Sequence, residues 1–112
     1  MLPKFQRLNL KTDFKWAAAG KKVESKFAKL FVKMSDNVFP RIGITVSGKV
    51  FKKATERNRA RRLVSVAFES LYKSLPKNIN IVALPKLTVL DVKSGDVLMD
   101  LEAVLKNEKI ID

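Results

Sequence analysis

Side chains that could bind phosphate are concentrated in one stretch of the sequence, S-G-K-V-F-K-K-A-T-E-R-N-R-A-R-R over residues 47–62. Guanidinium groups bind phosphate oxygens through paired hydrogen bonds, and ammonium groups add positive charge. The stretch has only one acid, Glu56. Its basic residues are Lys49, Lys52, Lys53, Arg57, Arg59, Arg61 and Arg62. We therefore expect an anion-binding site here; the alternative is a solvated charged face.

The basic stretch continues into a helical pattern, which must position these side chains. The apolar residues that recur every three or four positions are Ala60, Leu63, Val64, Ala67, Phe68, Leu71 and Leu75. This stripe predicts a helix over about Thr55–Leu75 that packs on a core, with Thr55 as its N-cap. Arginines at a helix start oppose the macrodipole at a cost of up to about 1 kcal/mol each, which an anion would offset. Arg59 and Arg62 point away from the stripe, so we expect removing both charges to weaken binding without unfolding the protein.

Composition limits the possible classes of function. The 112 residues suffice for one domain, which we assign to 1–112. Residues 1–62 contain 17 Lys and Arg against 4 Asp and Glu, whereas residues 63–112 contain 6 against 7. A basic half beside a neutral half favours a polyanion-binding face. The absence of Cys and His excludes disulfides, Cys/His zinc sites and Ser–His nucleophiles.

The sequence offers no catalytic or metal-binding constellation. The acids in the basic half are too few and too dispersed to form a two-metal nuclease site. The longest apolar run, Ile81–Leu84, is far too short to span a bilayer, and no signal peptide is expected at the N-terminus. We therefore expect no protein-borne catalytic residue, no metal site, no membrane partner and a cytoplasmic location.

The remaining elements follow from periodicity and turn residues. Residues 1–12 should be extended, with Leu2, Phe5 and Leu8 as anchors. The expected elements are a helix capped by Thr12 or Asp13 and running to Ala19, a strand over Lys22–Met34, a strand over Arg41–Ser47, a central strand over Asn80–Leu84, a loop over Pro85–Gly95 and a helix over Asp96–Lys106. The first two strands, joined by a short turn, should form a hairpin.

The first expected strand has two different faces. Its even positions, from Ala28 to Met34, are apolar, while its odd positions are Phe27, Lys29, Phe31 and Lys33. Aromatic rings between lysines suit a nucleic-acid platform, because bases stack on the rings and ammonium groups meet phosphates. In the alternative, the two rings pack under a helix and the lysines lie at its rim.

Several blocks of the sequence, in order, resemble one known family. They are Leu2-Pro3 with Arg7-Leu8, Asp13-Phe14 followed by Gly20-Lys21, Arg41-Ile42-Gly43-Ile44-Thr45-Val46-Ser47, Arg57-Asn58-Arg59-Ala60-Arg61-Arg62-Leu63, and Ile81-Val82. The chain resembles the protein subunit of bacterial ribonuclease P. The Arg-Asn-Arg block after a Val-Ser strand is the most specific of these matches.

The resemblance implies an α+β fold, an α/β sandwich in which a small mixed sheet of about four strands packs with three helices. It also implies a left-handed βαβ crossover, which is unusual for parallel strands. In this family the RNA carries the chemistry and the Mg²⁺ ions, and hydrolysis releases the 5′ leader of precursor tRNA. The protein would then be a non-catalytic subunit that binds ribonuclease P RNA and precursor tRNA, has no cofactor of its own and is monomeric when free. A structural or ribosomal RNA-binding protein is the alternative.

The resemblance also assigns roles to individual residues. The implied RNA contacts are Lys49, Lys52, Lys53, Arg57, Asn58, Arg59, Arg61 and Arg62. The implied leader cleft contains Phe14 and Phe31, and we add their neighbours on the strand, Phe27, Lys29 and Lys33. One departure concerns this cleft, because Ala18 stands where the family usually has a second aromatic residue. Trp16 lies nearby, but on a helix it would point in another direction.

Overall fold

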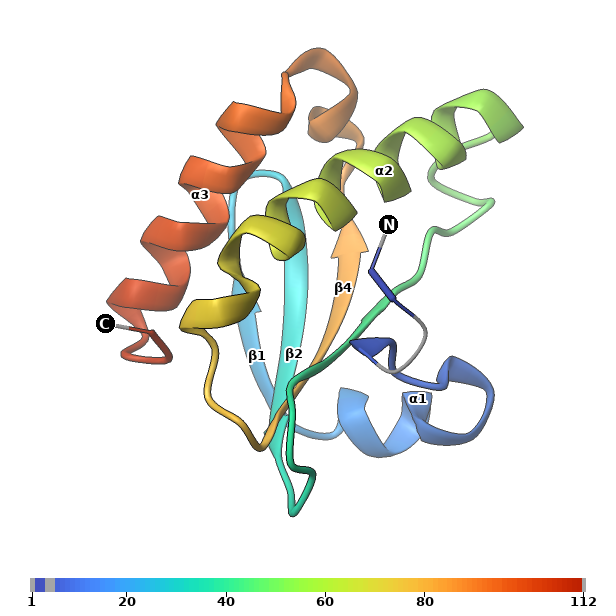
Figure 1. The fold of residues 1–112 in the computed structure, drawn as a ribbon. Coiled ribbons are helices and arrows are strands. Elements are labelled where there is room, and N and C mark those ends of the chain that lie inside the picture. Colours follow the sequence, from blue (N-terminus) through green and yellow to red (C-terminus); the bar gives the residue numbers. More distant parts are fainter. Residues whose placement is uncertain (1, 4–5, 112) are drawn as a thin grey trace.

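The computed structural model describes residues 2–3 and 6–111, so the expected anchor Phe5 lies outside the described part. In this part, three α-helices and four strands form the α+β fold that was expected (Figure 1). The elements are α1 (Leu10–Ala18), β1 (Lys21–Glu24), β2 (Ala28–Met34), β3 (Arg41–Ile44), α2 (Ala54–Leu71), η2 (Tyr72–Ser74), β4 (Ile79–Pro85), η3 (Leu87–Asp91) and α3 (Ser94–Asn107).

The strands form one mixed sheet in the order β1-β2-β4-β3. β4 is central, as predicted, and pairs antiparallel with β2 and parallel with β3. The parallel pair is joined through α2. In Figure 1 both strands run upward, α2 crosses in front and β4 lies to the left of β3. The crossover is therefore left-handed, as the resemblance implies.

The single strand predicted over Lys22–Met34 is wrong, because this segment folds into the antiparallel β1–β2 hairpin. Its turn is closed by side chains rather than by a glycine. The Ser25 hydroxyl donates to the Ala28 carbonyl oxygen (3.0 Å) and accepts from the Ala28 N–H (3.1 Å). The Asp100 carboxylate of α3 accepts from the N–H groups of Lys26 (3.3 Å) and Phe27 (3.1 Å).

The predicted hairpin between the segments now seen as β2 and β3 is also wrong, because β4 lies between them. Side chains tie the connecting turn to β4. The Asn37 amide donates to the carbonyl oxygens of Phe39 (2.7 Å) and Ile79 (3.2 Å), and the buried Asn80 amide donates to Asn37 Oδ1 (2.9 Å). These bonds satisfy polar groups of the turn, although β2 and β3 on either side of it do not pair with each other.

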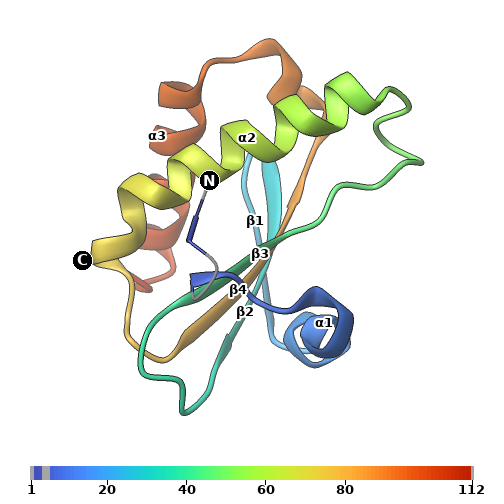
Figure 2. The same cartoon turned by 45° about the vertical axis from the view of Figure 1, so that its right-hand side comes forward.

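Helices cover both faces of the sheet. α2 and α3 pack on one face, and every residue of the predicted apolar stripe of α2 is buried there. Figure 2 shows α1 on the opposite side of the sheet. A second, smaller cluster fills the space beneath α1, and its members are Leu8, Ala17 and Val82 with the partly buried Leu10, Phe14, Phe31 and Leu84.

The helix ends differ from the predicted caps. Asn9 caps α1, with its side chain accepting from the Lys11 N–H (3.1 Å), so Thr12 and Asp13 both lie inside the helix. α2 begins after Lys53 without a side-chain cap, and Thr55 lies in its first turn. After α2, the Tyr72 hydroxyl donates to the Pro40 carbonyl oxygen (2.7 Å), and burial raises the pKa of this phenol above its usual value.

Gly20 allows the end of α1 to lie against β2, which leads to a stability prediction. A Cβ at this position would overlap the Val32 carbonyl oxygen, whereas a Cβ at Gly95, in the first turn of α3, would have no atom within 4 Å. We expect Gly20→Ala to lower the free energy of unfolding by about 1–3 kcal/mol through overpacking. The matched control Gly95→Ala should raise it by about 0.5–1 kcal/mol, because alanine favours helix. Urea unfolding followed by circular dichroism measures both, and equal effects would contradict the close approach at Gly20.

Candidate nucleic-acid interface

The start of α2 presents a basic surface with unsatisfied backbone donors. Lys53, at the N-cap position, is extended (φ −99°, ψ 139°), and no side chain caps the first turn. The first N–H groups of a helix have no partner within the helix, so an uncapped start can accept an anion. Lys49, Lys52, Lys53, Arg59 and Arg62 are all exposed around this end.

Two residues of the Arg-Asn-Arg region stabilise local structure. Arg57 is half-buried, and its Nη1 donates to the Phe51 carbonyl oxygen (2.8 Å), which fixes the segment leading into α2. Arg61 Nη1 donates to Asn58 Oδ1 (3.2 Å) one turn earlier. The Arg61–Asn58 pair is exposed at the surface, so both side chains can still face a ligand.

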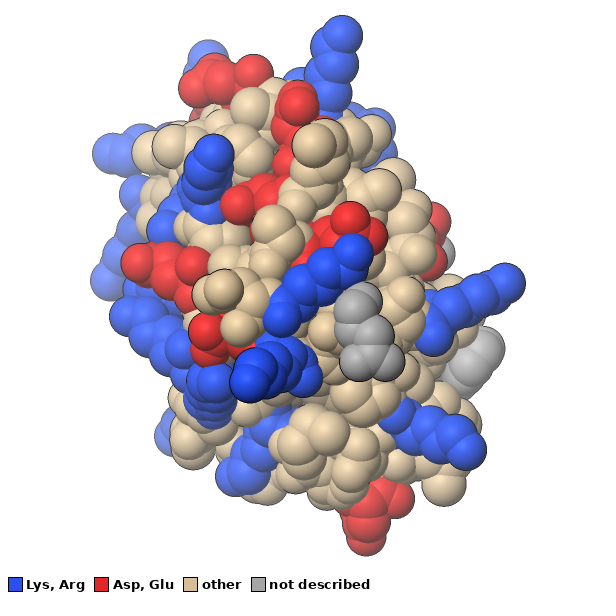
Figure 3. Space-filling model, turned by 90° about the vertical axis from the view of Figure 1, so that its left-hand side faces the viewer, with Lys and Arg blue, Asp and Glu red and all other residues tan. Residues whose placement is uncertain are grey.

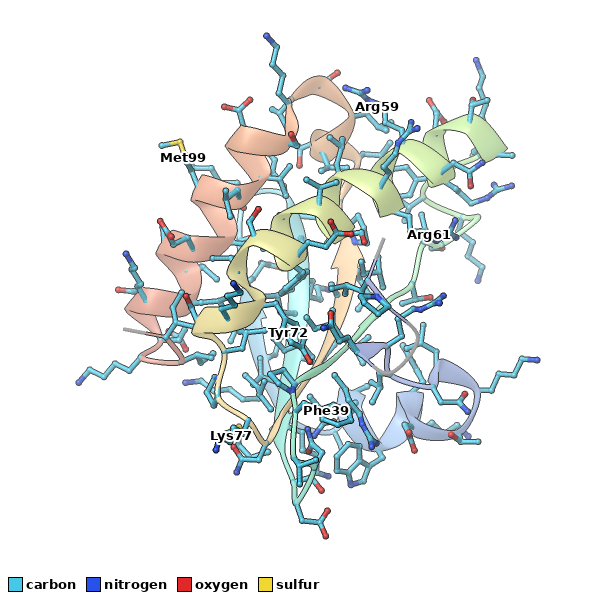
Figure 4. All side chains as sticks on the ribbon, viewed as in Figure 1. Phe39, Arg59, Arg61, Tyr72, Lys77 and Met99 are labelled. Carbon is cyan, nitrogen blue, oxygen red and sulfur yellow. The ribbon has the colours of Figure 1, made fainter. Side chains whose placement is uncertain are left out.

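Arg59 has structural partners that the sequence did not indicate. Its guanidinium donates to the carbonyl oxygens of Leu90 (3.4 Å) and Val92 (3.2 Å), at the end of η3. Figure 4 shows Arg59 on the side of α2 that faces this segment. Arg59 therefore links α2 to the segment before α3. A loss of RNA binding on its substitution would have two possible causes, so Arg62 is the cleaner probe of RNA contact.

The sheet face under α1 brings together Phe14 and Phe31, whose proximity could not be decided from the sequence. Phe31 lies opposite Val82 in the β2–β4 register, and both belong to the cluster that includes Phe14. Lys29, two residues earlier on β2, lies opposite Leu84 on the same face. Half-buried rings and a lysine thus share one surface.

Two hollows extend along this surface and adjoin at Thr45. One, of about 530 Å³, is lined by Leu10, Lys11, Thr12, Phe14, Lys15 and Thr45. The other, of about 350 Å³, contains Lys29 and Leu84 and continues to Lys86 and Leu87; it also contains Glu24, which pairs with Lys86 (3.5 Å). We call this pair of hollows the α1 groove. Its apolar floor and lysine rim could hold a flexible polyanion that carries flat apolar groups.

The other two residues assigned to the cleft lie elsewhere. Phe27 precedes β2 and packs against the main core beside α3, where it lines a separate hollow with Met99 and Asp100. Lys33 shares the sheet face with Phe31, but its Nζ lies 4.8 Å from the centroid of the Trp16 ring, at the far end of α1. Of the five, only Phe14 and Lys29 line the α1 groove, and Phe31 packs with Phe14 in the cluster beneath it.

Positive charge is distributed unevenly over the surface. Figure 3 shows the face occupied by α3, where acidic side chains lie among basic ones, while Lys and Arg crowd the left edge of that view. The ion pairs in the described residues join Lys21 to Glu108 (2.8 Å), Lys86 to Glu24 (3.5 Å) and Lys106 to Glu102 (4.0 Å). None of them neutralises the start of α2.

Among the described residues, no group of three or more acidic, Cys or His side chains lies close enough to hold a metal ion. None of the helices in residues 2–3 and 6–111 has the length and apolar character needed to cross a membrane.

The sequence resembles ribonuclease P proteins. The profile of the Ribonuclease P family matches residues 2–109. The ribonuclease P protein component of Pseudanabaena sp. is 36% identical over 109 residues, covering 96% of this chain and 90% of the relative. The ribonuclease P protein component of Pseudoalteromonas atlantica is 46% identical over 57 residues, but that alignment spans only 51% of this chain and 47% of the relative.

Structural comparison agrees with the sequence matches. The ribonuclease P protein of Thermotoga maritima superimposes with a TM-score of 0.79 at 29% identity, covering 90% of this chain and 96% of that one. A mutant ribonuclease P protein of Staphylococcus aureus has a TM-score of 0.82 at 23% identity, covering 96% and 92%, and supports the fold alone. The profile match over nearly the whole length and the Pseudanabaena alignment establish the family. The chain belongs to the ribonuclease P protein family.

Proposed function

We propose that this protein is the RNA-binding subunit of ribonuclease P, and that it assists removal of the 5′ leader from precursor tRNA. In this proposal the start of α2 binds the ribonuclease P RNA and the α1 groove binds the single-stranded leader. The observation that supports it best is the uncapped, arginine-rich start of α2 in a member of this family.

The start of α2 suits a folded RNA because its donors are fixed in place. The exposed Lys53 adjoins the first turn, whose N–H groups no side chain caps, so one phosphate could meet both backbone and side-chain donors. Arg57, held by the Phe51 carbonyl, keeps the preceding lysines beside the helix. Such contacts recognise the RNA backbone, so we expect affinity to depend on salt more than on base sequence.

The α1 groove suits a single strand for a different reason. Bases can stack on the half-buried Phe14 ring while Lys11, Lys15 and Lys29 approach the phosphates. Phe31 lies deeper in the cluster and supports the groove floor. Holding the leader beside a positively charged subunit would also reduce repulsion between the two RNA molecules.

The chain itself supplies no hydrolytic step in this proposal. The described residues contain no group of three or more acidic side chains placed to hold a metal ion, and in this proposal the Mg²⁺ ions and the reacting groups belong to the RNA. The protein residues bind, orient and neutralise phosphates. This division predicts that the protein alone leaves precursor tRNA uncleaved.

The first test removes two exposed cations at the start of α2, Lys53 and Arg62, by Lys53→Ala/Arg62→Ala. We expect the dissociation constant for ribonuclease P RNA to rise about a hundredfold, because each of the two charge-assisted contacts contributes about 1.5 kcal/mol. The slope of log K against log salt should become shallower by about 1.4–1.8, the value for two lost phosphate contacts. Cleavage at low Mg²⁺ should be rescued by the wild-type protein and less by the variant.

A matched control removes two lysines at the opposite end of α2, by Lys73→Ala/Lys77→Ala. Both side chains are exposed, and Figure 4 shows Lys77 far from Arg59 and Arg61. This variant has the same net charge as the test variant and should keep near wild-type affinity. Equal losses in the two variants would mean that net charge alone drives binding. Binding of the RNA without rescue of cleavage by the wild-type protein would refute the proposed function.

The second test concerns the leader. Phe14→Leu keeps apolar volume in the cluster but removes a stacking surface, so affinity for precursor tRNA should fall about 5- to 150-fold, the range for loss of stacking on one base. Affinity for tRNA without a leader should stay unchanged. Phe27→Leu is the control, since Phe27 packs beside α3 rather than in the α1 groove. An equal effect of both substitutions, or an effect on leaderless tRNA, would refute the assignment of the groove.

A further inference from the structure

Trp16, the only tryptophan in the chain, is a large aromatic side chain that neither the core nor the α1 groove accounts for. It lies on α1 and is 38% exposed. The Lys33 ammonium lies 4.8 Å from the centroid of its ring and donates to the Trp16 carbonyl oxygen (3.3 Å). A cation over one ring face is attracted by the ring quadrupole. The indole is therefore held in position while part of its surface stays open.

The exposed part of Trp16 borders a hollow of about 610 Å³ between α1, β3 and the turn before β3. This volume falls within the range of about 300–1,000 Å³ that is typical of small-ligand sites. The other residues that line the hollow are Leu8, Asp13, Ser35, Asp36, Asn37, Val38, Arg41 and Asn80. We call it the Trp16 hollow. It shares no lining residue with either hollow of the α1 groove.

Cations flank the floor of the Trp16 hollow. Asn80 of β4 lies opposite Lys33 on one side and Arg41 on the other, so these three residues form one row across the sheet. Side chains in such a row project from the same face. The Trp16 ring lies over the Lys33 end of this row, and the exposed Arg41 marks the other end.

Two carboxylates line the hollow, Asp13 and Asp36, and Asp36 accepts from the Ser35 hydroxyl (3.3 Å). Asp13 provides an acceptor beside Trp16. It precedes Trp16 by three residues, which places both side chains on one face of α1. Within the described part of the chain, the Asp13 carboxylate has neither a hydrogen bond nor an ion pair. Because this carboxylate repels phosphate, an RNA ligand would enter with its base and leave its phosphates outside, near Arg41.

We propose that the Trp16 hollow binds one unpaired guanine base of an RNA strand. The base stacks on the indole, and its Watson–Crick edge donates two hydrogen bonds to the Asp13 carboxylate. Guanine offers two adjacent donors on that edge, N1–H and the N2 amino group, which match the two carboxylate oxygens. Adenine and cytosine offer one amino donor there, and uracil one ring N–H. This site would add base selectivity to a protein whose other proposed contacts are made mostly to phosphates.

The emission of Trp16 reports on this hollow directly, because the chain has no other tryptophan. The probes are pentauridylate and three pentanucleotides in which the central uridine is replaced by G, A or C. At constant salt, the G probe should quench Trp16 saturably and at a concentration about tenfold lower than the others, the scale of bidentate readout of one base. Ribose 5-phosphate should not quench.

Asp13→Asn tests the carboxylate, and Asp91→Asn is its matched control, because Asp91 lies in η3 outside the hollow. We expect the preference for G to fall below about threefold in Asp13→Asn and to stay unchanged in Asp91→Asn. A purely structural role of Asp13 would shift affinity for all four probes together. No saturable quenching, equal affinity for the four probes, quenching by ribose 5-phosphate, or an unchanged preference in Asp13→Asn would each overturn the proposal.

The same emission distinguishes the two RNA molecules that could supply the base. Quenching when the ribonuclease P RNA is added would assign the guanine to that RNA. Quenching only when precursor tRNA joins the assembled complex, and not with leaderless tRNA, would assign it to the leader. Absence of quenching in both steps would overturn the inference. None of these outcomes depends on whether the protein stimulates cleavage, so the site and the proposed function can fail separately.

Discussion

The burial of both faces of β4 is the constraint on which the other elements depend. Ile79, Ile81 and Ala83 face the core under α2 and α3, while Val82 lies in the cluster under α1. All four side chains are fully buried, and burying a Val or Ile side chain stabilises the fold by about 1.5–3 kcal/mol. Without α1, Val82 would meet water. The helix that forms one wall of the candidate groove is thus also needed to complete the core.

This arrangement determines where positive charge can lie. Helices cover both sheet faces, and exposed cations lie around the start of α2, on α1 and at outer strand positions such as Lys22 and Arg41. A formal net charge of +12 on 112 residues opposes the compact state through self-repulsion. The ion pairs of the described residues lie away from the start of α2. An RNA partner that binds the folded protein more tightly than the unfolded chain would relieve that repulsion and stabilise the fold.

The sequence predicted the elements whose signal is local, and it missed those that depend on distant residues. The helical stripe of α2 and the continuous apolar run of β4 are local signals, and the structure confirmed both elements. The β1–β2 turn depends on Asp100, which is 73 residues beyond Phe27, and β2 and β3 are separated by a strand that comes after α2. The acceptors of Arg59 likewise lie more than 30 residues away, at Leu90 and Val92. A sequence period gives no information about such contacts.

β3 connects the two candidate RNA-binding regions. The Leu8 N–H donates to the Ile42 carbonyl oxygen (3.1 Å), and Arg7 forms a parallel bridge with the same residue, which anchors the segment leading into α1. A Cβ on Gly43 would come within 2.6 Å of Leu10 Cδ2, so α1 starts in close contact with β3. Leu8, Gly43 and Arg61 of α2 border one hollow of about 180 Å³. β3 therefore anchors the start of α1 and borders one hollow with α2, so a shift of either helix relative to β3 would change the spacing between the two candidate RNA-binding regions.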